Sequence, residues 1–237
     1  MHPLAAPSRQ SLRATRNRYE GQKAVILCNG PSLNRVDFDA LLKSGVFTFG
    51  MNKINLLFSK SDFRPSCVVA VNEHVIEQNA AFFKETAIPV YLNAKGVSVT
   101  GRAKQITYLH MNNRMRYFAG DCSMSVYSGS TVTYVAMQLA YHMGFDRVAL
   151  VGCDHNFSGQ ANPNETLVSG QTDPNHFHPD YFAGGNLWQY PDLVASEFSY
   201  KMADEYYRQH GRKLYNATEG GKLELLERID LNSFLAL

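Results

Sequence analysis

The sequence predicts an α/β fold: a Rossmann-like, doubly wound, mostly parallel sheet with helices on both faces. Apolar runs typical of buried strands alternate with helical patterns along the chain, and this alternation favours right-handed crossovers and a parallel sheet. With 237 residues, 45% of them hydrophobic, the chain can bury a full core but is short for two domains. We therefore expect a flexible basic leader at 1–22 and a single domain at 23–237.

Each strand is predicted from a short apolar run that ends in a turn or a polar residue. The run at 23–28 is continuously apolar, as in strands buried on both faces, and 130–143 is the clearest helix. Further strands are expected at 46–52, 66–72, 88–93, 105–111, 147–153 and 213–217, and helices at 36–43, 75–85, 191–210 and 223–227. The stretch 154–190 has no regular pattern and is rich in Asn, Gly, Pro and His, which predicts a long loop or lid near 155–190.

The charge balance bears on the kind of partner. The formal net charge is +2, from 23 basic and 21 acidic residues, whereas nucleic-acid binders concentrate far more positive charge on one face. We therefore expect no nucleic-acid partner. Arg9, Arg13, Arg16 and Arg18 nevertheless crowd the leader. A solvated, partly disordered segment explains them, and a docking arm for an anionic membrane surface or a partner is the alternative.

The cysteines and the apolar stretches bear on the compartment. None of the four cysteines is paired at CxxC spacing, so we expect reduced thiols. No N-terminal apolar stretch is long enough for a signal peptide, and none approaches the length of a membrane span. A cytoplasmic protein is expected, with peripheral association with the inner membrane as the alternative that the basic leader leaves open.

Asparagine recurs where the predicted strands end. Asn29, Asn52, Asn72 and Asn93 follow four of them. The carboxyl ends of parallel strands converge on the ligand crevice of an open α/β sheet, and an amide side chain offers both donors and an acceptor. Asparagine is also a common turn residue. Because asparagine recurs at the same end of four strands, a polar binding site explains it better than turn formation does. The base and ribose of a nucleotide are suitable ligands for such a site.

Two glycine turns add candidate anion-binding backbone. Asn29-Gly30-Pro31-Ser32 leads into a helix whose free N–H groups and positive dipole end suit phosphate, without the pattern of a Walker loop or a GxGxxG fingerprint. Ser128-Gly129 leads into the helix at 130–143, where helix capping and phosphate or carboxylate binding both fit. Asp154 follows another strand at the same edge of the sheet. Its carboxylate either orients a sugar hydroxyl or caps the loop.

The long loop carries a histidine pair. His176 and His178 lie within the run DPNHFHPDYF at 173–182, among carboxylates and aromatic residues. Histidine suits proton transfer near neutral pH, and a carboxylate can set its tautomer. A general base, a structural histidine and a metal ligand all remain open, although no third metal ligand is evident. Tyr181, Trp188 and Tyr190 either form an aromatic wall for a sugar ring or pack the loop onto the domain.

An ordered set of these motifs resembles a known bacterial family. The run VILCNGPSL at 25–33, Asn52, Ser128-Gly129 and Gly152-Cys153-Asp154 are similar to motifs of the Campylobacter-type sialyltransferases and of the motility accessory factors. The run NHFHPDYF and the segment 215–224 look closer to the accessory factors. The resemblance covers most of residues 23–225. The chain departs from the sialyltransferases at 124–127, where they carry a basic residue before the Ser-Gly turn.

The resemblance implies a glycosyltransferase of variant GT-A fold that uses a CMP-activated nonulosonic acid as donor, with no obligatory metal. By position, Asn29, Gly30, Pro31, Ser32, Asn52 and Asn72 would contact the cytidine nucleotide. Ser128 and Gly129 would meet the phosphate or the donor carboxylate, and Asp154 would lie on the same rim. The general base would be His176, with His178 as the second choice. Tyrosines or backbone amides would stabilise the departing charge, and Tyr181 is a candidate catalytic residue. The acceptor would be a glycan or a protein.

Other readings remain. The chain also resembles the archaeal 6-hydroxymethylpterin diphosphokinases, which use ATP and magnesium, although the third strand ends in Val71-Asn72-Glu73 and lacks their acidic strand end. A non-catalytic nucleotide-binding module is a third reading. The chain could also form a homo-oligomer, and the apolar stretches at 82–83 and 234–237 are the candidate interface.

Overall fold

An eight-stranded sheet forms the centre of the protein, and all of its neighbouring strands run parallel. The computed structural model describes residues 5–114 and 116–237. The strand order is β12-β11-β8-β1-β2-β3-β4-β5. The strands are β1 (Lys23–Leu27), β2 (Phe47–Met51), β3 (Cys67–Ala70), β4 (Val90–Asn93), β5 (Ile106–Leu109), β8 (Arg147–Val151), β11 (Lys213–Asn216) and β12 (Glu227–Arg228).

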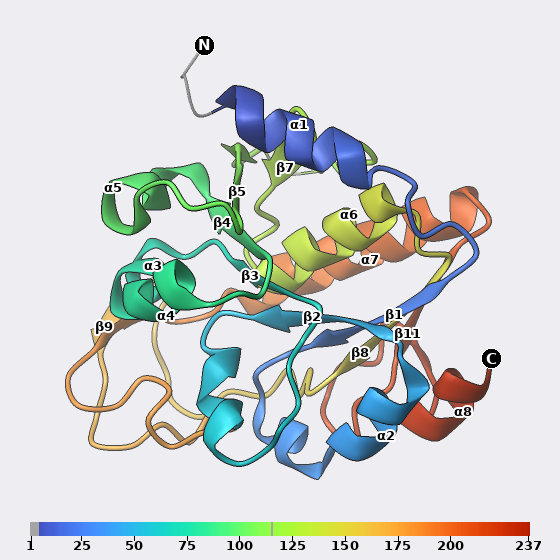
Figure 1. Cartoon of the computed structure of the whole chain (residues 1–237). Helices are drawn as coiled ribbons and strands as arrows, with labels where there is room; N and C mark the ends of the chain where they lie inside the picture. The colour runs from blue at the N-terminus through green and yellow to red at the C-terminus, as the bar shows by residue number, and fades with distance from the viewer. Residues whose placement is uncertain (1–4, 115) are drawn as a thin grey trace.

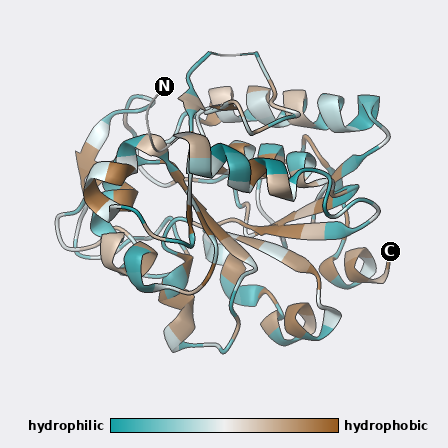
Figure 2. Ribbon diagram, turned by 45° about the horizontal axis from the view of Figure 1, so that its top comes forward, coloured by the Kyte–Doolittle hydropathy of each residue, from teal (hydrophilic) through white to brown (hydrophobic). Residues whose placement is uncertain are grey.

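Helices cover both faces of this sheet, which confirms the doubly wound arrangement (Figure 1). On one face lie α1 (Ala5–Thr15), α6 (Val132–Met143) and α7 (Leu193–Gln209). On the other lie η1 (Pro31–Arg35), α2 (Phe38–Ser44), η2 (Ile54–Ser59), α3 (Glu73–Gln78), α4 (Ala80–Glu85) and α8 (Leu231–Ala236), while η3 (Ala94–Gly96) and α5 (Val97–Thr100) connect β4 to β5. Figure 2 shows the strands as the hydrophobic centre between these layers.

The strand order creates a switch point beside β1. From β1 the chain proceeds through β2, β3 and β4 to β5 on one side, and later places β8 on the other side of β1. The loops that follow β1 and β8 therefore diverge, and open α/β sheets bind ligands in the crevice at such a point. The topology predicts a site at the carboxyl ends of β1 and β8.

The central helix α6 is buried because it lies between the sheet and α7. Eleven of its twelve residues are buried, including the polar side chains of Thr133, Gln138 and His142. Thr131 caps its first turn by accepting a hydrogen bond from Thr133 N, and Gly144 ends the helix in a left-handed conformation. The helix predicted at 130–143 is confirmed except for its first two residues, which form the turn before it.

The expectation of a flexible leader is wrong from residue 5 onward, because α1 packs on the sheet edge. Its Leu12 is buried, and its Ser8 and Ser11 hydroxyls hydrogen-bond to Tyr108 N and to the Thr107 hydroxyl of β5. The buried His142 of α6 bonds through Nε2 to Leu12 O at 2.8 Å. The buried Leu12 and the bonded serine hydroxyls fix this helix to the sheet although arginines crowd the segment.

Two other expectations also change. The helix predicted at 223–227 is absent; there Arg228 donates hydrogen bonds to the carbonyl oxygens of Leu223, Thr218 and Gly220 and holds an irregular loop, and the terminal helix is α8 instead. The helix predicted at 75–85 divides at Asn79 into α3 and α4. In the proposed oligomer stretches, Phe83 and Phe234 are fully buried in the core of the chain itself.

The predicted long loop carries a small hairpin and is fixed to the domain. Its strands β9 (Thr166–Val168) and β10 (Leu187–Gln189) pair antiparallel. Phe177 N donates to Asn29 O at 2.9 Å, and the Asn34 amide donates to Phe177 O at 2.8 Å. A second short pair joins β6 (Met111–Asn112) to β7 (Val126–Tyr127). The loop therefore covers the ends of the central strands as a fixed flap.

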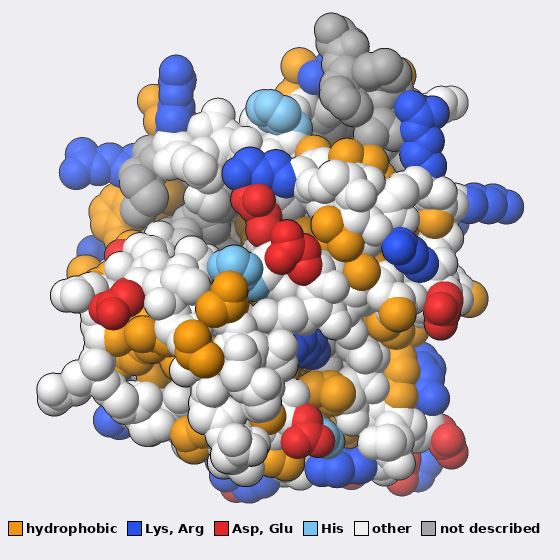
Figure 3. Space-filling view, turned by 90° about the vertical axis from the view of Figure 1, so that its left-hand side faces the viewer, with side chains coloured by type: hydrophobic (Ala, Val, Ile, Leu, Met, Phe, Trp, Pro, Cys, Tyr) orange, Lys and Arg blue, Asp and Glu red, His pale blue; other side chains and the backbone are white. Residues whose placement is uncertain are grey.

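The surface and the helices add two observations. On the face shown in Figure 3, Lys and Arg side chains lie at separate places and Asp and Glu side chains are interspersed among them. Within residues 5–114 and 116–237, no helix is both long enough and apolar enough to cross a membrane.

Candidate functional site

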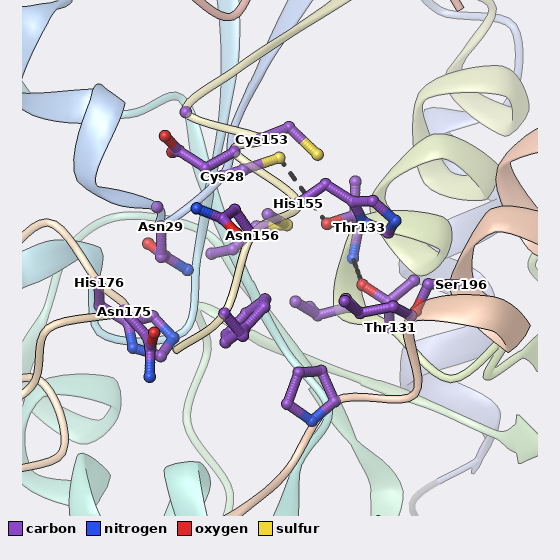
Figure 4. Close-up of a pocket in the computed structure, with 18 of the residues that line it drawn as sticks. Cys28, Asn29, Thr131, Thr133, Cys153, His155, Asn156, Asn175, His176 and Ser196 are labelled. Atoms are coloured by element: carbon purple, nitrogen blue, oxygen red, sulfur yellow. Dashed lines mark hydrogen bonds between the residues drawn. The ribbon is translucent and has the colours of Figure 1, made fainter. Parts of the chain in front are cut away.

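Two connected cavities lie at the switch point. The smaller, about 170 Å³, is bounded by the ends of β1 and β8 and the starts of α6 and α7 (Figure 4). The larger, about 720 Å³, extends over the ends of β3 and β4 towards the flap, and its size is within the range of small-molecule sites. The cavities share the wall residues Asn52, Ser130, Thr131, Val132, Phe157, His176 and Pro191, so they form one continuous cleft.

All four strand-end asparagines line this cleft, as their positions predict. Asn29 lines the smaller cavity, Asn72 and Asn93 line the larger, and Asn52 lines both. Asn72 caps α3, accepting from Val75 N, and donates to Gln189 at 2.8 Å. Asn93 accepts from Lys95 N and donates to Val71 O. These two side chains therefore serve the turns around them.

Asn29 and Asn52 differ from the other two. Their side-chain oxygens are buried and have no hydrogen-bond partner in the described part of the chain. Asn52 also adopts a left-handed backbone with φ of 54°. Most buried polar atoms are paired, so an unpaired one needs an explanation. A ligand that donates hydrogen bonds at the ends of β1 and β2 would supply it.

The first glycine turn brings β1 and β8 close together. A Cβ on Gly30 would lie 2.7 Å from Gly152 O and would overlap the Asp154 carboxylate. Asp154 Oδ2 accepts hydrogen bonds from the hydroxyl of Ser32 at 2.7 Å and from its backbone N–H at 3.1 Å. Glycine is therefore required sterically, and Asp154 is held in a fixed orientation at the cavity wall.

The second glycine turn shapes the start of α6. Gly129 and Ser130 both have left-handed backbones, with φ of 51° and 60°. A Cβ on Gly129 would collide with the buried ring of Tyr134. The turn presents Ser128 to the larger cavity, and Ser130 and Thr131 to both cavities. Hydroxyl groups therefore surround the positive end of the helix dipole, an arrangement that suits an anion.

Of the predicted histidine pair, His176 reaches the cleft, and it lines both cavities. Its Nδ1 lies 2.7 Å from Asp173 Oδ2, and its ring stacks on Tyr181 at 4.0 Å with an interplanar angle of 1°. Burial opposes ionisation of Asp173, but the hydrogen bond from His176 and its charge outweigh burial and lower the pKa of this carboxyl. Nε2 is the ring nitrogen left to accept a proton from a ligand.

Several predicted contacts are not on the cavity walls. Pro31 and Gly129 shape turns, and Ser32 binds Asp154 from behind. His178 accepts from Asp180 N within its own turn and lies outside both cavities. Tyr181 is fully buried beneath His176, so its hydroxyl cannot reach a substrate. None of these five residues lines either cavity, so the expectation that they contact the ligand directly does not match the walls of the cleft.

Sequence reasoning overlooked Lys53, which supports the flap. This lysine is buried, and its Nζ donates to Tyr181 O at 2.6 Å and to Gln78 Oε1 at 2.8 Å. It also lies 4.9 Å from the centroid of the Phe182 ring. Burial lowers the pKa of Lys53 to about 8, although the charge of Asp173 opposes this shift. A lysine directly after a strand-end asparagine carries no sequence signal of burial.

The low pKa of Lys53 predicts a specific pH dependence of stability. Burial disfavours the charged form by roughly 3 kcal/mol, so this cost is complete below pH 8 and disappears as pH rises towards the unfolded value near 10.5. The unfolding temperature of the wild type minus that of Lys53→Met should therefore increase between pH 8 and pH 10. Thermal unfolding of both proteins across this range tests it, and parallel curves would contradict it.

A second imidazole was also overlooked. His155, directly after Asp154, lines the smaller cavity and lies 2.9 Å through Nε2 from Glu197 Oε1 of α7. Glu197 is 42 residues away in the chain, so only tertiary structure pairs them. In the described part of the chain, no three His, Cys, Asp or Glu side chains are grouped so that they could hold a metal ion.

Fold and site together define a Rossmann-like α/β protein with a polar cleft across the carboxyl ends of its central strands. The chain belongs to the 6-hydroxymethylpterin diphosphokinase MptE-like family, whose model matches residues 4–160. None of the curated proteins compared with the chain is significantly similar to it in sequence.

A solved structure supports the fold. The MAf glycosyltransferase from Magnetospirillum magneticum AMB-1 superposes with a TM-score of 0.55 over 97% of this chain, at 12% sequence identity. The chain spans 39% of the length of that protein. The structural similarity confirms the Rossmann-like architecture. The family model confirms the expected relation to the diphosphokinase-like proteins.

Proposed function

We propose that this protein is a glycosyltransferase that moves a nonulosonic acid from a CMP-activated donor to a glycan or protein acceptor. Three observations support the proposal: the ordered motifs of the sequence, the fold shared with a glycosyltransferase, and the cleft. The observation that carries it is the pair of buried, unpaired amide oxygens of Asn29 and Asn52 at the switch point. A cytosine amino group and ribose hydroxyls are donors that would satisfy them.

The two cavities suggest how the substrates are arranged. Part of the nucleotide occupies the smaller cavity, with its phosphate near the hydroxyl-rich start of α6. The sugar and the acceptor occupy the larger cavity, where Phe182, Trp188 and Tyr190 provide aromatic surface for a sugar ring. His176 lies on the walls of both cavities, so the reacting carbon falls beside it.

This arrangement defines the chemical step. An acceptor hydroxyl forms a bond to the anomeric carbon while Nε2 of His176 takes its proton. The bond between the anomeric carbon and the phosphate oxygen breaks, and its electron pair leaves with CMP. Asp173 keeps the imidazole in the correct tautomer and stabilises the imidazolium that forms. No step of this proposed mechanism requires a metal.

A magnesium-dependent diphosphokinase is the second candidate, because the matching family is described by that activity. Magnesium bound with ATP takes one or two carboxylates together with phosphate oxygens. Asp154 is the carboxylate of the smaller cavity, and Ser32 already occupies its Oδ2. Asp173 and Glu197 are paired with histidines. Glu73 of the larger cavity is paired with Lys95. Because each of these carboxylates already has a partner, the donor set fits magnesium less well than it fits a metal-independent transfer.

A thermal-shift panel separates the candidates. With CMP at about one hundred times its dissociation constant, binding adds about 2.7 kcal/mol and should raise Tm by roughly 5–10 °C. Cytidine, uridine, guanosine and adenosine nucleotides are compared with and without Mg²⁺. A shift with ATP that requires Mg²⁺, and none with CMP, would reject the glycosyltransferase. CMP binding without release of CMP from the donor on prolonged incubation would indicate a non-catalytic module.

A further inference from the structure

The His155–Glu197 pair lies in the same cleft as His176 but on a different wall. Figure 4 shows Asn175 and His176 on one side of the smaller cavity, and Thr131 and Ser196 on the other. His155 bonds to Glu197, the residue after Ser196, and therefore belongs to the second side. Its side chain is 7% exposed, so the imidazole is enclosed rather than spread on the surface.

The backbone at His155 is held in an uncommon conformation. Its φ of 51° places a non-glycine residue in the left-handed region directly after Asp154. Such a conformation costs free energy, persists only where the surroundings enforce it, and often occurs at functional sites. Here it turns the chain out of β8 so that the imidazole reaches α7 and the cavity.

His155 lies closer to the start of α6 than its aromatic-packed counterpart His176 does. Its ring centroid lies 6.1 Å from that of Tyr200, whose hydroxyl is 3.5 Å from that of Thr131, the N-cap of α6. His176 is instead packed among the rings of Phe157, Tyr181 and Phe182. His155 lines only the smaller cavity, whereas His176 lies where the two cavities join.

We propose that His155 contacts the phosphate of the nucleotide donor and stabilises the charge that this phosphate gains as it leaves. The assignment rests on the proposed function and gives the two imidazoles separate tasks. His155 uses Nε2–H to bind Glu197 and, when protonated, donates Nδ1–H to a phosphate oxygen. The proton stays on His155, the electron pair of the broken C–O bond stays on CMP, and the acceptor's proton goes to His176.

Other titratable groups around His155 do not replace it in this task. They are Glu197 on α7, Tyr200 on α7, Cys28 after β1, Cys153 and Asp154 after β8, and His176 on the flap. The hydrogen bond with Cys153, followed by burial, raises the pKa of Cys28, and burial raises the pKa of Tyr200. Both stay neutral near pH 7. The remaining carboxylates and the thiol cannot carry a positive charge. His176 can, but it is assigned to take the proton of the acceptor.

Binding of CMP compared with cytidine tests this assignment, because the two ligands differ only in the phosphate. His155→Gln should weaken binding of CMP about tenfold or more and leave binding of cytidine unchanged, as measured by calorimetry. Glu197→Gln, which loses the charge that orients the imidazole, should show a smaller loss in the same direction. His178→Gln is the matched control, since that imidazole lies outside both cavities, and it should bind both ligands normally.

Turnover supplies an independent readout. In His155→Gln, kcat for release of CMP from the donor should fall about 10²-fold. Equal affinity of wild type and variant for CMP overturns the assignment, and so does an equal loss for CMP and cytidine. A wild type that binds neither ligand overturns the proposed function itself, and the phosphate assignment with it.

Discussion

Replacing His176 with alanine should lower kcat for release of CMP from the donor about 10²- to 10⁴-fold and leave the affinity for CMP unchanged. The imidazole is the group at the junction of the two cavities whose Nε2 is left to take a proton. Its removal deprives the acceptor of a base but removes no contact proposed for the nucleotide. Steady-state kinetics with calorimetric binding of CMP separate the two effects.

Two further variants show whether the geometry around His176 matters. Asp173→Asn should retain the imidazole but disturb its tautomer, so an intermediate loss of kcat is expected. His178→Ala removes an imidazole two residues away that lines neither cavity, and activity should be retained. Full activity in His176→Ala would show that the assigned base is wrong. Loss of CMP binding in the same variant would place His176 among the nucleotide contacts.

Replacing Tyr181 with alanine should destabilise the protein by about 3–5 kcal/mol, the usual cost of truncating a large buried aromatic residue. Its ring is fully buried, stacks on His176, and contacts Phe177 and Phe182 edge to face. The cavity left behind would remove the surface against which the imidazole is held. Urea unfolding should show the loss of stability, and turnover should fall as well because His176 loses its orientation.

Tyr181→Phe is the matched control for this variant. Burial raises the pKa of the Tyr181 phenol, although the nearby Asn52 side chain opposes this shift, and the buried hydroxyl forms no hydrogen bond of good geometry in the described part of the chain. Removing a buried, unpaired hydroxyl while keeping the ring should be nearly neutral or stabilising, and activity should be retained. A large loss of activity in Tyr181→Phe with stability intact would restore the earlier prediction that the hydroxyl takes part in catalysis.

Most strands of the main sheet could be predicted from the sequence, because a strand buried on both faces leaves a continuous apolar run. β1, β8 and β11 follow the runs expected at 23–28, 147–153 and 213–217, and they differ from them only at their ends. Helix α6 was equally clear, since Gly144 marks its end. β12 has two residues and α1 has a weak apolar stripe, so neither left a pattern strong enough to outweigh the charges around it.

Site residues at strand ends could be predicted from the sequence. Site residues whose role depends on a partner far away in the chain could not. Asn29, Asn52 and Asp154 line the smaller cavity because parallel strands finish at one edge of the sheet. Nothing local distinguishes Asn52, whose oxygen is unpaired, from Asn72, whose side chain caps α3. That difference arises from the neighbours that the fold supplies.

The sequence by itself determined the class of fold, the rim on which the polar residues gather and the presence of a histidine in the covering loop. These features follow from periodicity and turn chemistry, which act between residues close in the chain. Only the tertiary structure decided that His176 rather than His178 faces the cleft, that Tyr181 and Lys53 support it from behind, and that His155 meets Glu197. Each of these depends on burial and contact between segments far apart in the chain, and such contacts leave no local pattern.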